Sequence, residues 1–224
     1  MQSLSEQIAK RRLGISILVP ALLLVLLWLV YFLALNSEGG SFYWLGIYPR
    51  TVGGLVGIVL SPFIHADLEH ALSNSIALAL MGVAVFYFYP REAFQVLLVG
   101  WLCSGILTWI IARPSYHIGA SGLIYVFGVY LIFRGWRVHR KTLAALSLLV
   151  TFSYGSMLWG IFPNEEAISW EGHLSGALVG LVLALGQKIE TNEQSAAFGT
   201  PSAYNFSSSH TGLPNWKIRY RSLR

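Results

Sequence analysis

The stretch "HIGASGLIYVFG", residues 117–128, places one serine between small residues in an apolar segment. Ser121 has Gly119 two positions before it and Gly122 directly after it. A serine hydroxyl becomes a nucleophile when a base lies within hydrogen-bond reach and donors face the oxyanion that forms. His173, in the segment "GHLSGALVG", is the candidate base, and the apolar runs contain no carboxylate. These residue types predict a Ser-His dyad.

The segment "HADLEH", residues 65–70, invites comparison with a metal site. Zinc-binding helices carry two histidines on one face, in the patterns H-E-x-x-H or H-x-x-E-H. His65 and His70 are five residues apart, which turns them about 140° from each other on a helix. Neither zinc pattern matches, although His65 escapes the angle argument if the helix begins after it. We therefore predict no metal ion and no other cofactor.

The elements that position these residues are long and apolar. The chain has 224 residues, of which 55% are hydrophobic and 11% are charged, whereas about a quarter are charged in a soluble domain. A helix needs about 20 apolar residues to cross a bilayer, with about 17 near the lower limit. Six uncharged runs meet or approach this length: Leu13–Ser37, Ala71–Pro90, Ala93–Ala112, Ile118–Phe133, Thr142–Pro163 and Gly172–Gln187.

These runs predict an all-α membrane protein, with residues 13–187 forming one bundle of six transmembrane helices. The fourth and sixth runs are short, which suits central helices that neighbouring helices cover. The first run is too long for the apolar region of a cleavable signal peptide, so we expect it to be a retained helix. Cys103 is the one cysteine of the chain, which excludes an intramolecular disulfide.

Basic residues predict the orientation. If the N-terminus is cytoplasmic, 13 of the 15 Lys and Arg residues lie in inside segments, and the other two are Arg50 and Arg113. The positive-inside rule therefore places both termini in the cytoplasm, with residues 1–12 as a short leading segment and residues 188–224 as a flexible tail. The net charge of +5 reflects this orientation, and no clustered basic surface indicates a nucleic-acid partner.

The polar residues lie at one depth in this topology. His70 and Asn74 are four residues apart, so they share a helix face near the outer end of the second run. At 1.5 Å per helical residue, they lie roughly 5–8 Å below the outer surface, level with Ser121 and His173. Each residue alone has an ordinary explanation, because serine and glycine pack helices together and asparagine joins them by hydrogen bonds. Their common depth favours a functional site.

Three motifs, "SPFIHADLEHALSN", "HIGASGLIY" and "GHLSGALVG", occur in this order and lie on the second, fourth and sixth predicted helices. In this respect the chain resembles the rhomboid intramembrane serine proteases in their six-helix form. The resemblance extends from the first predicted helix to Gln187. It implies that Ser121 is the nucleophile and His173 the base, and that His70 and Asn74 line the oxyanion hole with Ser121.

The resemblance also implies supporting residues. His65 matches a histidine with a structural role, and Tyr125 matches a ring that supports the base. Gly119 and Gly122 belong to the serine motif and, with the glycines at 176 and 180, let two helices approach closely.

The first loop departs from the pattern of the family. Many members carry adjacent Trp and Arg residues there, whereas Trp44 and Arg50 are separated in this chain. The resemblance further suggests a substrate gate formed by the fifth helix and the polar loop that follows it, which contains Asn164, Glu165 and Glu166.

The sequence thus predicts an intramembrane serine endopeptidase of the bacterial inner membrane, which cleaves transmembrane helices of other membrane proteins near the outer face. Its expected partners are those helices and the lipid bilayer. One alternative is a non-catalytic rhomboid-like protein that binds or escorts transmembrane clients, although such a protein would usually lack the serine or the histidine. A six-helix transporter would need charged or broken helices at mid-membrane, and the polar residues here cluster on one side.

Overall fold

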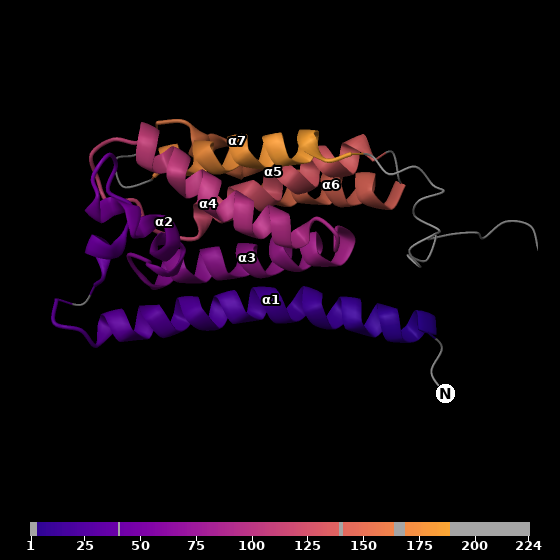
Figure 1. The fold of residues 1–224 in the computed structure, drawn as a ribbon, viewed down its shortest axis with the longest axis horizontal. Coiled ribbons are helices and arrows are strands. Elements are labelled where there is room, and N and C mark those ends of the chain that lie inside the picture. Colours follow the sequence, from indigo (N-terminus) through magenta and orange to yellow (C-terminus); the bar gives the residue numbers. More distant parts are fainter. Residues whose placement is uncertain (1–3, 40, 139–140, 164–168, 189–224) are drawn as a thin grey trace, which may run out of the picture. The chain divides into compact units, whose positions relative to one another are not determined.

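The computed structural model describes residues 4–39, 41–138, 141–163 and 169–188 (Figure 1). Over these ranges the regular structure is helical, without strands, apart from one isolated bridge between Ile47 and His117. The α-helices are α1 (Leu4–Leu35), α2 (Gly57–Leu60), α3 (Leu68–Phe88), α4 (Ala93–Ile111), α5 (Ser121–Arg137), α6 (Lys141–Tyr154) and α7 (Trp170–Gly186). Short 3₁₀ helices are η1 (Tyr43–Leu45), η2 (Gly53–Leu55), η3 (Ser61–Phe63) and η4 (Gly155–Ile161). The predicted all-helical class is confirmed.

Three helical segments are long and apolar enough to cross a membrane: Glu6–Leu35, Leu68–Phe88 and Ala93–Ile111. The helices α6 and α7 are shorter apolar helices, and α5 has 17 residues. The predicted run 142–163 is not one α-helix, because α6 ends at Tyr154 and the chain continues as η4 from Gly155. A glycine at this point favours the change, since glycine weakens an α-helix by about 1 kcal/mol relative to alanine. The predicted tail beyond residue 188 lies outside the described residues.

Helix α5 is the centre of the bundle. It packs against α3, α4, α6 and α7, and its Val126, Phe127, Tyr130 and Leu131 are completely buried. This explains how a short run can serve as a helix here, because neighbouring helices cover it. Helix α1 instead packs on α3 (Figure 1). It leaves large apolar side chains exposed, among them Leu18, Leu22, Val25 and Leu29. An apolar surface of this kind is typical of contact with lipid.

Glycines bring α5 and α7 into backbone contact. A Cβ atom on Gly176 would collide with the carbonyl oxygen of Gly122, and one on Gly180 would collide with the carbonyl of Val126. Helices in lipid gain little from apolar burial, so close packing of small residues is a main source of their association. The glycine motif that the sequence indicated is therefore a packing contact, and it sets the distance between α5 and α7.

A buried ion pair joins the helices at the end of α5 that is far from Ser121. The guanidinium of Arg134, 3% exposed, donates to the carboxylate of Glu92, and Tyr130 donates its hydroxyl to the same carboxylate over 2.6 Å. Arg134 also donates to the backbone oxygens of Gln187 and Lys188, at 3.2 and 2.9 Å. These carbonyls follow α7, so one side chain ties α5 to the end of α7 and to the turn before α4.

Replacing Gly176 with valine should push α7 away from α5. Overpacking of a close contact typically costs about 1–3 kcal/mol, so the unfolding temperature of the purified protein in detergent should fall. Gly186→Val is the matched control, because Gly186 also lies in α7 and its Cβ position has no heavy atom within 4 Å. Equal unfolding temperatures for the two variants would show that the contact of Gly176 with Gly122 does not limit the approach of the helices.

Candidate active site

Ser121 and His173 face each other across the contact of α5 and α7. Ser121 is the first residue of α5 and follows Gly119, whose φ of +100° favours glycine at this turn. His173 lies in the first turn of α7. Its Nε2 atom lies 2.8 Å from the Oγ atom of Ser121, which is hydrogen-bond distance. Two residues 52 positions apart in the sequence are thus brought together by the two helix starts.

The second ring nitrogen of His173 defines its tautomer. The Nδ1 atom lies 2.9 Å from the carbonyl oxygen of Gly160. A carbonyl oxygen can only accept, so Nδ1 carries the hydrogen of the neutral ring and Nε2 is left with its lone pair. This is the form that can accept the proton of the Ser121 hydroxyl. Tyr125 stacks on the imidazole, with ring centroids 4.4 Å apart and 12° between the planes.

Glu171 is the carboxylate nearest to His173 in the sequence, and it pairs with Arg113. The sequence placed the start of the sixth helix at Gly172, whereas α7 begins at Trp170 and so includes Glu171. The side chain is 2% exposed, and its Oε1 atom pairs with Arg113 Nε at 3.6 Å and accepts from the Arg113 backbone N–H at 3.3 Å. Among the described residues, the hydrogen bonds of the His173 ring go to Ser121 and Gly160.

His70 and Asn74 lie on one face of α3, close to the turn before Ser121. Asp67 caps α3 by accepting from the His70 backbone N–H at 2.7 Å. The His70 ring contacts this turn, since a Cβ atom built on Gly119 would be 2.7 Å from its Nε2 atom. Asn74 is buried and donates its amide to the His70 carbonyl at 2.8 Å, which leaves its Oδ1 atom without a described partner. One N–H of the Asn74 amide is therefore used within its own helix.

His65 packs beside His70, at a centroid distance of 4.9 Å and an interplanar angle of 71°. Burial, and next the neighbouring His70, lower the pKa of His65 to about 4, so the ring is neutral near pH 7. His65 precedes α3, which begins at Leu68, so the helix-angle argument does not apply to it. Within the described ranges, no three His, Cys, Asp or Glu side chains are grouped so that they could hold a metal ion.

The first loop holds the serine turn in place. Ile47 and His117 exchange backbone hydrogen bonds of 2.9 and 2.8 Å, and the Gly119 N–H donates to the Ser61 carbonyl at 2.9 Å. The ring of His117 bridges the Arg113 carbonyl at 3.1 Å and the Ser169 hydroxyl at 2.6 Å, and burial lowers its pKa. His117 opens the serine motif, but the sequence pattern predicted no role for it.

A small cavity of about 40 Å³ borders this turn and has room for a water molecule. Its polar lining comes from the first loop, α4 and the starts of α5 and α7: Ser61, Thr108, His117, Ser121 and Ser169.

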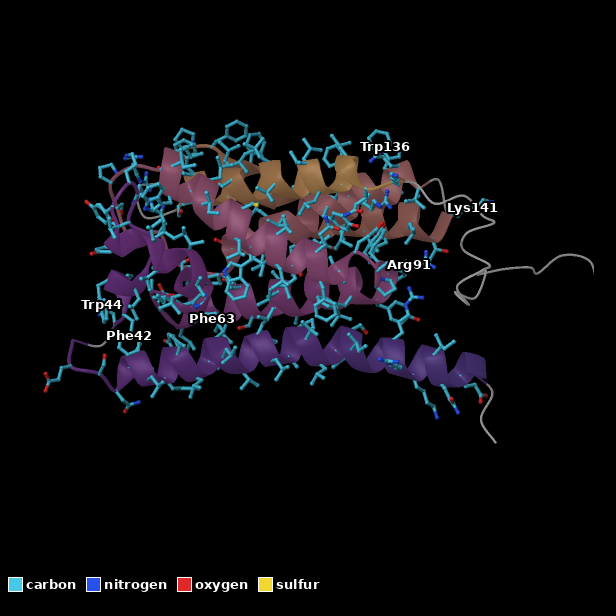
Figure 2. The ribbon with its side chains drawn as sticks, in the orientation of Figure 1. Phe42, Trp44, Phe63, Arg91, Trp136 and Lys141 are labelled. Atoms are coloured by element: carbon cyan, nitrogen blue, oxygen red, sulfur yellow. The ribbon has the colours of Figure 1, made fainter. Side chains whose placement is uncertain are left out.

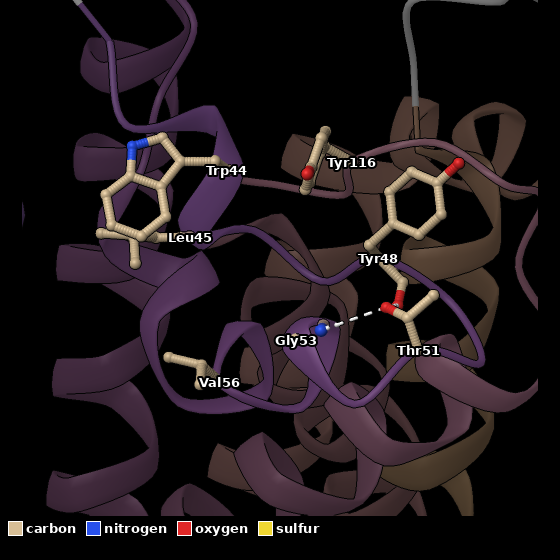
Figure 3. A pocket seen from close by; sticks show the side chains of 8 residues that line it. Trp44, Leu45, Tyr48, Thr51, Gly53, Val56 and Tyr116 are labelled. Carbon is tan, nitrogen blue, oxygen red and sulfur yellow. Dashed lines mark hydrogen bonds between the residues drawn. The ribbon is translucent and has the colours of Figure 1, made fainter.

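A larger hollow of about 520 Å³ lies in the first loop, away from the dyad (Figure 3). It is lined by Trp44, Leu45, Tyr48, Thr51, Gly53, Gly54, Val56 and Tyr116. Trp44 in this lining is 64% exposed, whereas Arg50 donates to the carbonyls of Ile110 and Ala112 at 3.0 and 2.7 Å. Arg50 thus ties the loop to the end of α4, and the separated Trp and Arg have different roles. The predicted gate residues Asn164, Glu165 and Glu166 lie outside the described residues.

The chain is similar to known proteins. The Rhomboid domain family matches residues 52–187, the part of the chain that holds α2 to α7. An uncharacterized protein of Mycobacterium tuberculosis is 34% identical over 148 residues, 62% of each chain, so the present chain spans less than two thirds of that relative. An uncharacterized protein of Mycobacterium leprae is 32% identical over 187 residues, 76% of this chain and 70% of the relative.

A more distant relative carries a family name. A protein of Acanthamoeba polyphaga mimivirus that is named a rhomboid protein is 24% identical over 172 residues, 73% of this chain and 87% of the relative. The family match covers more than half of the chain and includes both Ser121 and His173. The chain is a membrane protein that belongs to the rhomboid family.

Proposed function

We propose that this chain is an intramembrane serine endopeptidase that cleaves transmembrane helices of other proteins near the outer face of the membrane. The observation that carries the proposal is the geometry of His173, with Nε2 2.8 Å from the Ser121 hydroxyl and Nδ1 held by a carbonyl. A base in this tautomer beside a hydroxyl is what nucleophilic catalysis requires. Membership of the rhomboid family agrees with this chemistry.

Ser121, His173 and water supply the nucleophiles and the proton transfers of this reaction. The Oγ atom of Ser121 attacks the substrate carbonyl carbon while its proton passes to Nε2 of His173. The C–N bond then breaks, the proton is transferred to the leaving amine, and an acyl-enzyme remains on Ser121. Water attacks this ester with the same base, which releases the acid and restores the serine. A peptide bond inside a helix is shielded, so the substrate must unwind locally before the attack.

The proposed topology has six membrane helices, α1 and α3 to α7, with both termini in the cytoplasm of a bacterial cell and the helices in its inner membrane. Ser121 and His173 lie in the first turns of α5 and α7, at the same end of the bundle, and Arg113 pairs with Glu171 there. The opposite end of the bundle carries Arg91 and Lys141, whereas Phe42 and Trp44 lie at the end that holds the first loop (Figure 2). This distribution supports the positive-inside orientation and a site on the outer side.

A rhomboid-like protein that only binds or escorts transmembrane clients is the second candidate. The hydrophobic bundle and the family match fit it equally well. The stacked and hydrogen-bonded His173 favours the protease, because client binding alone would not require a fixed tautomer beside a serine.

Ser121→Ala and His173→Ala should each abolish cleavage of a reporter transmembrane substrate in liposomes. Removal of either member of a nucleophile–base pair is expected to lower kcat on the order of 10⁴-fold or more. Ser104→Ala is the matched control, because Ser104 is a buried serine whose hydroxyl donates only to its own helix, at the Trp101 carbonyl. Cleavage by the Ser121→Ala variant at the wild-type rate would exclude the serine mechanism, and loss of wild-type activity on chelation would indicate a metal mechanism.

His70→Ala and Asn74→Ala should lower kcat and leave KM near its original value. A donor that reaches the substrate oxyanion stabilises the transition state, and its loss typically costs about 10²–10³-fold in kcat. The bond to the His70 carbonyl uses one of the two N–H donors of Asn74, so the other is available for this role. Steady-state kinetics and thermal unfolding of each variant distinguish this role from a packing role. An unchanged kcat with a lowered unfolding temperature would make both residues packing elements.

A further inference from the structure

We propose that the backbone carbonyl of Gly160 orients His173 and takes the place that a carboxylate occupies in a catalytic triad. This role rests on the proposed function, since it concerns the base of the same reaction. Gly160 is then a positioning residue, because its oxygen touches the base and not the substrate. Its effect is to keep the proton of the neutral imidazole on Nδ1, so that Nε2 stays available to Ser121.

The contacts around the imidazole leave little freedom for the ring. Tyr125 covers one face, Ser121 occupies the Nε2 side, and the Gly160 oxygen occupies the Nδ1 side at 2.9 Å. A histidine with only one fixed contact could rotate or change tautomer. With all three contacts present, the lone pair of Nε2 points to the hydroxyl that it must deprotonate.

Glycine fits at position 160 without displacing its neighbours. A Cβ atom there would collide with the Tyr125 hydroxyl and would lie 3.1 Å from Nδ1 of His173, closer than ordinary van der Waals contact. The absence of a side chain is therefore what brings the carbonyl within hydrogen-bond distance of the ring. Gly155, five residues earlier in η4, has open space around its Cβ position, so the demand for glycine is specific to position 160.

The position of Gly160 links the base to α6. Gly160 lies in η4, which continues from α6 and packs against α7. The buried residues of α6 are Leu143, Ser147 and Val150. Phe152 of α6 is 85% exposed, and Trp159 of η4 is 71% exposed. Helix α6 packs on α5 and reaches α7 through η4. It follows that η4 must lie against α7 for His173 to hold the productive tautomer.

The test replaces Gly160 with alanine and measures both the tautomer and the kinetics. Protein labelled with ¹⁵N-histidine reports which ring nitrogen carries the hydrogen, and a His173→Asn sample identifies the signal of His173. We expect the Nδ1–H tautomer in the wild-type protein and a population of the Nε2–H tautomer in Gly160→Ala. A displacement of about 1 Å can cost on the order of 10²-fold, and this loss should appear in kcat with KM little changed.

Gly155→Ala is the matched control, because it makes the same substitution in η4 without a collision, and it should keep the wild-type tautomer and kcat. In a Tyr125→Phe background, the added cost of Gly160→Ala should fall below about 10-fold, because the hydroxyl that collides with the new Cβ atom is gone. A Gly160→Ala variant that retains the Nδ1–H tautomer, whether kcat falls or not, would overturn the proposal. If the wild-type protein cleaves no reporter, the proposed function fails. The histidine spectra still decide whether the Gly160 carbonyl keeps the hydrogen of the His173 ring on Nδ1.

Discussion

The close approach of α5 and α7 is the constraint on which the site depends. Helices in lipid gain little from apolar burial, so a stable contact needs backbones that come near each other. Gly122, Gly176 and Gly180 allow this, because a Cβ atom at either α7 position would strike a carbonyl of α5. The contact begins in the first turns of both helices, so it sets the 2.8 Å between Ser121 and His173 directly. The packing of α5 on α7 and the distance between the Ser121 and His173 side chains therefore depend on the same glycine contact.

The same contact is fixed at its far end by polar groups. Helix ends leave carbonyl oxygens without partners, and these are costly to bury in an apolar medium. Arg134 serves this need by donating to two carbonyls that follow α7 while its charge is balanced by Glu92. Arg50 donates to the carbonyls of Ile110 and Ala112 at the end of α4, and so ties the first loop to this helix. Arg134 therefore holds the end of α7 on α5, and the glycine contact holds its first turns, where His173 lies.

The sequence predicted the α-helices well and their ends less well. Apolar runs locate α1, α3 and α4 because these helices need their full length in lipid. Composition alone does not mark the end of an α-helix, so the change to η4 after Tyr154 was missed, and the start of α7 was placed two residues late. The motifs drew attention to Ser121 and His173 because their polar groups are in the side chains, and the structure places these groups 2.8 Å apart. The partner of His173 on Nδ1 is a backbone oxygen, which has no side-chain signature in a sequence.

For His173 as the proposed base, a carbonyl partner also suits the apolar surroundings of a membrane helix. A carboxylate without full compensation is expensive to bury at membrane depth, and it would carry that cost whether or not substrate is bound. A backbone carbonyl is already present, is neutral, and needs a partner in any case once η4 leaves the α-helical pattern. Glu171 illustrates the alternative, since its buried charge is paired with Arg113 rather than with the imidazole two residues away. An uncharged acceptor beside a neutral histidine thus provides orientation at a lower desolvation cost than a third ionised side chain would.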